Sequence, residues 1–249
     1  MKQRLLFFLI LLILSQQSGW TQNSIDDFFM KTEAFFTGRI LEGKIDTNKL
    51  ILNEQQLNHL LFQLDSLNLS NYDAATQEAI LLNAHKLFVI NEIVQGNFPS
   101  QTSEFRKFLE EPKHFLNGTP LSLNAIRNDF LLGAYGDERI LLATGIATRG
   151  DGPIYEHAFF PDSLDRQLET LTINMMQDAH FIRVKTKSNY LLLPELMKDY
   201  MIYFGGNLSG LVRFVNVHRP GSSFVPSNYK VAFYPHSWKL NCVPIKPNF

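Results

Sequence analysis

Three side chains in this sequence are of the types that catalysis uses: His85, His157 and Arg149. An imidazole changes its charge near neutral pH and so serves as a general acid or base, while a guanidinium holds an anion. Together they would form the rewired, His-based site of a hydrolase acting on amides or esters. That hypothesis requires the three side chains to converge on one pocket, within about 10 Å, because catalytic groups must all reach one substrate.

Each of these residues also has a purely structural interpretation. His85 lies in an apolar helical segment, where we expect a buried imidazole that hydrogen-bonds to a backbone carbonyl. The position of His157 is typical of an exposed histidine at the end of a strand. Arg149 lies in a glycine-rich loop, residues 145–153, which has the composition of a mobile turn.

Two further polar residues, Asn83 and Arg139, are candidates for a pocket or for structure. Asn83 lies in the same apolar segment as His85, and its amide both donates and accepts, so we expect it to bridge the helix to a strand or loop beside it. Arg139 follows Asp137 by two residues. It is predicted either to pair with that carboxylate at the surface or to grip a carboxylate of a ligand.

Composition excludes several other classes of protein. A single cysteine, Cys242, in 249 residues cannot form an intramolecular disulfide, a cysteine-based zinc site or an iron–sulfur cluster. With 23 basic against 24 acidic residues there is no positive excess to bind phosphates, so no nucleic-acid partner is predicted. No two histidines have the spacing of a helical zinc site, and the sequence predicts neither a metal nor a cofactor.

The first 22 residues have the pattern of an export signal. Lys2 and Arg4 precede an apolar run, Leu5–Leu14, that would span only ~15 Å as a helix, about half of a bilayer core. We therefore expect a signal peptide over residues 1–22 and a single globular domain over 23–249. The mature protein would be periplasmic or extracellular, without a stable membrane span.

The elements that must position these side chains are mostly helices. Asp73 is a candidate N-cap for the longest helix, 74–95, which is apolar on most sides and therefore belongs at the centre of the domain. Other helices are expected at 25–36, 53–67 and 208–215. Three more are expected to begin at Ser122, Pro161 and Pro194; the first ends near Gly133, the second includes Met175 and the third ends at Gly205. Strands are expected at 115–121, 139–144, 181–184 and 230–234. This pattern predicts an α+β fold, mainly helical with a small, mostly antiparallel sheet.

Four segments of the chain match, in order, the pattern of one known family. Ala79–Lys86 corresponds to a buried helix reading Phe-Trp-Ile-Asn-Ala-Tyr-Asn-Ala, and Gly118–Asn128 to Gly-x-x-x-Ser-Leu-x-x-Ile-Glu-His. Asp137–Pro153 corresponds to an Asp-Pro-Arg-Ile strand and a loop with Cys, and Ser237–Asn241 to Asp-Trp-Ser-Leu-Asn. In these segments the chain resembles the domain-of-unknown-function family 547, of which it would be a divergent member.

The differences from that family concern its reactive positions. The family has Tyr-Asn at His85-Lys86, a histidine at Asn128, and a cysteine in the loop where this chain has Ile146 or another aliphatic residue. A cysteine–histidine pair works because the imidazole stabilises the thiolate nucleophile. The resemblance implies a papain-like fold; if the family are cysteine hydrolases, this chain has lost that chemistry.

Two functional hypotheses follow, and a purely structural domain is a third. The first is an exported, catalytically degenerate binding or scaffold domain of the cell envelope, whose partner is a small molecule or an envelope protein. The second is the rewired hydrolase. A cleft between helix 74–95 and loop 145–153 would serve either, and its candidate residues are Asn83, His85, Asn128, Arg139, Arg149 and His157.

Overall fold

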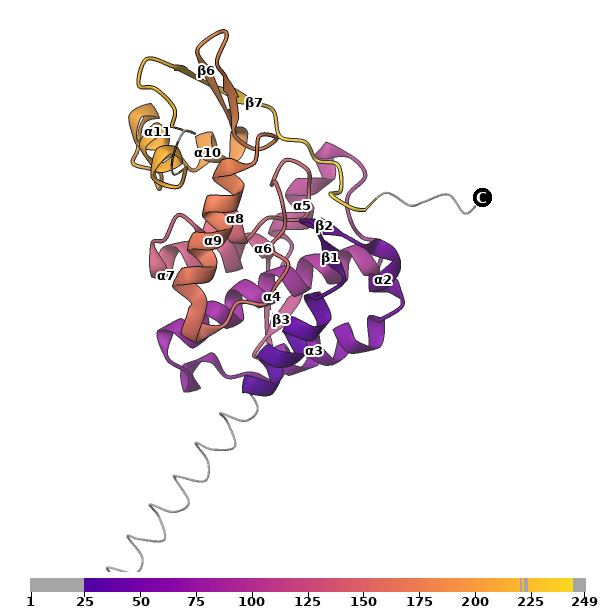
Figure 1. The fold of residues 1–249 in the computed structure, drawn as a ribbon. Helices are drawn as coiled ribbons and strands as arrows, with labels where there is room; N and C mark the ends of the chain where they lie inside the picture. Colours follow the sequence, from indigo (N-terminus) through magenta and orange to yellow (C-terminus); the bar gives the residue numbers. More distant parts are fainter. Residues whose placement is uncertain (1–24, 220, 222–223, 244–249) are drawn as a thin grey trace, which may run out of the picture.

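The centre of the molecule is α4 (Ala74–Val94), the helix that the sequence predicts to be buried (Figure 1). The computed structural model describes residues 25–219, 221 and 224–243, so the predicted signal peptide lies outside it. Asp73 caps the helix, since its Oδ1 accepts a hydrogen bond of 2.8 Å from the backbone of Thr76. Every side chain from Ala79 to Ile90 is buried, and a helix buried on all sides must be surrounded by other elements.

The surrounding elements are helices and two short hairpins. A first helix over 25–36 brings Phe28, Phe35 and Phe36 into the core. The other helical elements of this body are α2 (Thr47–Ile51), α3 (Glu54–Ser66), η1 (Leu69–Asn71), η2 (Thr102–Glu104), α5 (Phe105–Glu110), α6 (Leu123–Ala125), the π-helical η3 (Ile126–Leu132), α7 (Gly133–Tyr135), α8 (Ile140–Ala143), η4 (Pro161–Ser163) and α9 (Leu164–Gln177). The hairpins pair β1 (Ile40–Leu41) with β2 (Lys44–Ile45), and β3 (His114–Leu116) with β4 (Thr119–Leu121). In the described ranges no helix is both long and apolar enough to cross a membrane.

A smaller lobe stands on one end of this helical body, beyond α9 (Figure 1). Its three-stranded sheet has the order β5 (Arg183–Lys185), β6 (Tyr190–Pro194), β7 (Lys230–Tyr234). The β5–β6 pair is antiparallel and the β6–β7 pair is parallel, because α10 (Glu195–Asp199) and α11 (Leu208–Val217) lie between those two strands in the chain. After β7 the chain returns to the helical body, where Leu240 bridges to Thr148 and Cys242 to Ile45.

The mainly helical α+β fold with small sheets is confirmed, and three predicted segments need correction. The segment 139–144, predicted as a strand, forms α8, and the Thr144 hydroxyl bonds back to the Ile140 carbonyl. An apolar run of four residues fits a buried helix as well as a buried strand. Strand β5 starts at Arg183, later than predicted. The helix predicted from Pro194 to Gly205 ends at Asp199, and turns fill the interval.

Candidate functional site

A cleft with a volume of about 410 Å³ lies where the helical body meets the smaller lobe; we call it the α10 cleft. Its walls come from η3, the 145–153 loop, α10 and the returning segment after β7. The lining residues are Leu109, Arg127, Ile146, Asp151, Glu195, Leu196, Asp199, Tyr200, His236 and Trp238. Segments that are far apart in the sequence therefore meet in this cleft.

The glycine-rich loop folds around the carboxylate of Asp151. Its Oδ2 accepts hydrogen bonds from the backbone N–H groups of Ile146 (3.0 Å) and Thr148 (3.1 Å), and from the Thr148 hydroxyl (2.7 Å). Because that hydroxyl donates to Asp151, the His236 Nε2, 2.8 Å from the same Oγ, is the donor in its contact with Thr148. The three side chains form a chain of hydrogen bonds that ends on a carboxylate.

This loop is fixed to the returning segment of the chain. The backbone N–H groups of Arg149 and Gly150 donate to the carbonyls of Lys239 (2.8 Å) and Ser237 (2.9 Å). A loop whose backbone is hydrogen-bonded to a neighbouring segment in this way does not have the structure of the mobile turn that its composition suggests. The loop therefore presents Asp151 and Ile146 to the cleft in one defined arrangement.

His236 occupies a position that only a glycine opposite it allows. A Cβ atom on Gly150 would lie 2.6 Å from the imidazole ring. The His236 backbone N–H donates to Glu195 Oε2 (3.1 Å), and its ring lies 4.3 Å from that of Trp238. These contacts connect the loop wall of the cleft to the α10 wall.

The lining of the cleft carries charges of both signs, from Arg127 on η3 and from Glu195 and Asp199 on α10. Arg127, only 8% exposed, donates from Nη2 to Asn124 (2.7 Å), and its guanidinium lies 5.4 Å from the centre of the Tyr200 ring. Its buried Nε has no hydrogen-bond partner in the part of the chain that the structure describes. On α10, burial raises the pKa of Asp199, and the neighbouring Glu195 raises it further.

None of these charges is compensated by a salt bridge. Among the residues that the structure describes, no ion pair includes Arg127, Glu195 or Asp199. A charge in a concave, partly desolvated site is costly without a partner. The cleft is therefore suited to a ligand that supplies the opposite charges.

Among the described residues that line the cleft, none is a serine, threonine or cysteine. The 145–153 loop contributes the aliphatic side chain of Ile146, and the Thr148 hydroxyl is fully buried and bonded to Asp151. The one hydroxyl in the lining, that of Tyr200, donates to Asn128 Oδ1 (3.0 Å). In the described part of the chain, no group of three His, Cys, Asp or Glu side chains is placed to hold a metal ion.

Asn83 has the structural role that the sequence predicts. Its Nδ2 donates to the Phe159 carbonyl (2.8 Å), and its Oδ1 accepts from the Phe159 N–H (2.9 Å). Lys86, one turn further along α4, donates to the carbonyls of Tyr155 (2.9 Å) and His157 (2.8 Å), and burial lowers its pKa to about 7. Both side chains therefore anchor the 155–159 segment to the central helix.

His85 is buried as predicted, but the prediction that a backbone carbonyl satisfies it is wrong. Neither ring nitrogen has a hydrogen-bond partner among the described residues. Burial, followed by the proximity of Arg127 and His114, holds the pKa of His85 well below its usual range. The imidazole is therefore neutral at physiological pH and out of reach of a substrate.

The other candidate residues lie in separate places. His157, with 56% of its side chain exposed, bonds to Glu33 (2.8 Å), and Arg149 is exposed beside a different pocket that Cys242 also lines. Arg139 pairs with Asp137, as the sequence suggests, and also with Asp165 and Glu169. Since His85 is sealed in the core and His157 is at the surface, the three residues of the rewired hydrolase do not meet in one pocket.

The residues that do meet in the α10 cleft were largely missed from the sequence. A signal was present in Glu195 and Asp199, since two carboxylates four residues apart after a proline lie on one face of a helix. No such signal marks Arg127 or His236, because their place depends on how distant segments pack. In comparisons with known proteins, no family model, no curated protein and no solved structure matches this chain.

Proposed function

We propose that this protein is an exported binding domain of the cell envelope, a divergent and catalytically inactive relative of family 547, and that the α10 cleft binds a small zwitterion. The observation that carries the proposal is that one cleft is lined by Arg127 and by the carboxylates of Glu195 and Asp199, none of which forms a salt bridge with another described residue. Three wall segments come from the stretches that resemble that family. The papain-like relationship belongs to the same proposal.

A free amino acid or a short peptide has the chemistry that this arrangement recognises. Its carboxylate would face the guanidinium of Arg127, which is suited to planar anions. Its ammonium group would face Glu195 and Asp199. Trp238 and the aliphatic Ile146 offer an apolar surface for a side chain, and a volume of about 410 Å³ lies within the range of small-molecule sites.

Inactivity follows from the nucleophile position rather than from the shape of the cleft. Hydrolysis of an amide through a covalent intermediate needs a thiolate or an activated hydroxyl beside a base. Here the base candidate, His236, donates its Nε2 proton to Thr148, whose own proton is directed to Asp151. The hydrogen bonds from His236 through Thr148 to Asp151 therefore direct the donated protons toward the buried Asp151 carboxylate and away from a ligand in the cleft.

A thermal-shift panel of free amino acids, dipeptides and amino sugars tests the binding proposal. We expect zwitterionic members to raise the melting temperature of the wild-type protein, and Asp199→Asn and Arg127→Leu to abolish that increase. Asp162→Asn and Arg166→Leu, at exposed positions outside the cleft, are the matched controls. A panel in which the cleft variants and the controls respond alike would overturn the assignment of the site.

Export is tested by expressing the full chain with its own N-terminus in a bacterial host. The expected outcome is a periplasmic or secreted protein that lacks the first ~22 residues on N-terminal sequencing, as for a cleaved signal peptide. Full-length protein in the cytoplasm would contradict this part of the proposal without affecting the cleft.

A further inference from the structure

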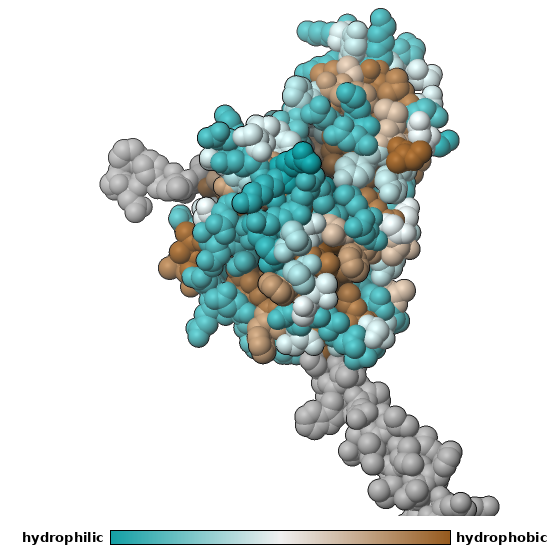
Figure 2. All heavy atoms as spheres, turned by 180° about the vertical axis from the view of Figure 1, so that it is seen from behind, coloured by the Kyte–Doolittle hydropathy of each residue, from teal (hydrophilic) through white to brown (hydrophobic). Residues whose placement is uncertain are grey.

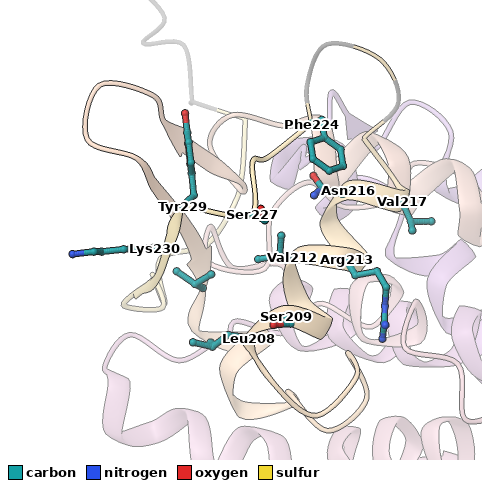
Figure 3. Close-up of a pocket in the computed structure, with 11 residues that line it drawn as sticks. Leu208, Ser209, Val212, Arg213, Asn216, Val217, Phe224, Ser227, Tyr229 and Lys230 are labelled. Carbon is teal, nitrogen blue, oxygen red and sulfur yellow. The ribbon is translucent and has the colours of Figure 1, made fainter.

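A second concave site, a groove with a volume of about 830 Å³, lies between α11 and β7 on the smaller lobe (Figure 3). Much of its lining is aliphatic or aromatic: Leu208, Val212, Val217, Phe224 and Val231. Leu208, Val217 and Phe224 are 46%, 67% and 62% exposed. In Figure 2, apolar atoms also gather on the lobe that holds α11 and the sheet. An exposed apolar groove of this kind marks an interaction site.

The β7 side of the groove is the open edge of the sheet. Tyr229, Lys230 and Val231 line it consecutively and no residue of β6 does, as expected for a strand approached from its edge. In the described ranges β7 pairs with β6 alone. The Lys230 N–H donates toward the β6 side, to Asn189 (2.9 Å), so the backbone groups of Val231 point away from β6, toward the unpaired edge of the sheet.

The groove is held open by contacts within the lobe. Asn216 on α11 clamps the backbone of Val225, accepting from its N–H (2.7 Å) and donating to its carbonyl (3.0 Å). The Tyr229 N–H donates to the Pro226 carbonyl (3.1 Å), which fixes the turn into β7. These contacts attach the segment that leads into β7 to α11.

The charge of the groove is positive only. Arg213 and Lys230 are its charged lining residues, they lie on opposite rims, and Val212 lies between them (Figure 3). Both are exposed, and neither takes part in an ion pair with another described residue. A partner with acidic side chains is the electrostatic complement.

We propose that β7 accepts an extended segment of another protein as a fourth strand of the sheet, and that this segment alternates apolar and acidic residues. Main-chain hydrogen bonds to the open edge at Val231 would provide the common part of the affinity. Apolar side chains of the segment would contact Val212 and Phe224, and its acidic side chains would face Arg213 and Lys230. This surface is separate from the α10 cleft and does not depend on its ligand.

The test uses a labelled peptide, Ac-Val-Glu-Val-Glu-Val-Glu-amide, and the whole protein, with binding followed by fluorescence anisotropy. We expect saturable binding that weakens at least 10-fold in Val231→Pro, which removes an edge N–H without touching the β6 ladder. Arg213→Glu is expected to weaken it 3- to 10-fold, and Lys187→Glu, outside the groove, to leave it unchanged. Circular dichroism checks that each variant is folded.

Two further arms keep the proposal falsifiable if a variant fails to fold. A peptide N-methylated at alternate residues cannot complete a ladder, so we expect it not to bind the wild-type protein, and a valine–lysine peptide is expected not to bind either. Equal binding of the N-methylated peptide would overturn strand addition. If the valine–glutamate peptide does not bind, the proposal is also overturned. If oleate at equal concentration displaces that peptide, the groove is a fatty-acid site and the proposal is overturned as well.

Discussion

At the scale of single residues, the polar side chains buried in and beside α4 differ in how well they are satisfied. Asn83 exchanges two hydrogen bonds with Phe159. Within the described residues, neither ring nitrogen of His85 has a hydrogen-bond partner, and the Nε2 atom of His114 has none either. Burial lowers the pKa of His114 to about 4 and holds that of His85 well below its usual range. Both imidazoles are therefore held neutral by the fold.

The neutral histidines predict a loss of stability in acid. Below pH 6.5 the unfolded chain takes up protons that the folded protein does not, so each imidazole lowers the free energy of unfolding by about 1.4 kcal/mol per pH unit. For His114 this continues down to about pH 4. Denaturant unfolding between pH 7 and pH 5 should show a shallower loss in the His85→Leu, His114→Leu double variant than in the wild type. Equal slopes would show that the two residues do not titrate as described.

Gly150 should be required for the position of His236. An added Cβ lies 2.6 Å from the imidazole ring, so Gly150→Ala is expected to displace the ring from Thr148 and to destabilise the protein by about 1–3 kcal/mol, as overpacking does. The same substitution in a His236→Ala background should cost much less, because the ring is gone. Unfolding of the four proteins gives the coupling, and a cost independent of His236 would refute the steric account.

At the scale of elements, α4 does more than fill the core, because Asn83 and Lys86 hold the 155–159 segment against it. Asn83→Ala would leave the Phe159 N–H and carbonyl buried without partners, which costs about 1–3 kcal/mol for each group. Asn91→Ala, on the same helix, is the control, since Asn91 is not among the buried residues of α4. We expect faster hydrogen exchange over residues 155–160 in Asn83→Ala only; the same exchange rates in both variants would contradict the anchoring role.

The elements that the sequence predicts well are those whose signals are local. Asp73 and the long apolar run define α4, and Ser122 caps α6 by accepting from the Ala125 N–H (3.0 Å). The segment 139–144 was misassigned because four apolar residues carry no periodicity. The role of Asn83 was predictable because an amide in an apolar helix needs partners on a neighbouring segment. The α10 cleft was not predictable from the sequence, since Arg127, Glu195 and His236 are brought together only by packing between the two lobes.

At the scale of the whole molecule, the two lobes offer two surfaces of different chemistry. The α10 cleft lies where they meet and combines Arg127 with the carboxylates of α10, while the groove on the smaller lobe is apolar and positively charged. Binding of a zwitterion in the cleft would connect the helical body to α10. Such a ligand should therefore stabilise both lobes together, by an amount that grows with its concentration.

The central claim is that the α10 cleft binds a zwitterion and does not hydrolyse it. One calorimetric titration of the wild-type protein with the dipeptide that gives the largest thermal shift tests both parts, because binding gives a saturating heat and turnover gives a sustained one. We predict saturation at one ligand per chain, a baseline that returns to its starting power, and loss of the binding heat in Asp199→Asn. A sustained heat in the wild type, or unchanged binding in that variant, would contradict the account.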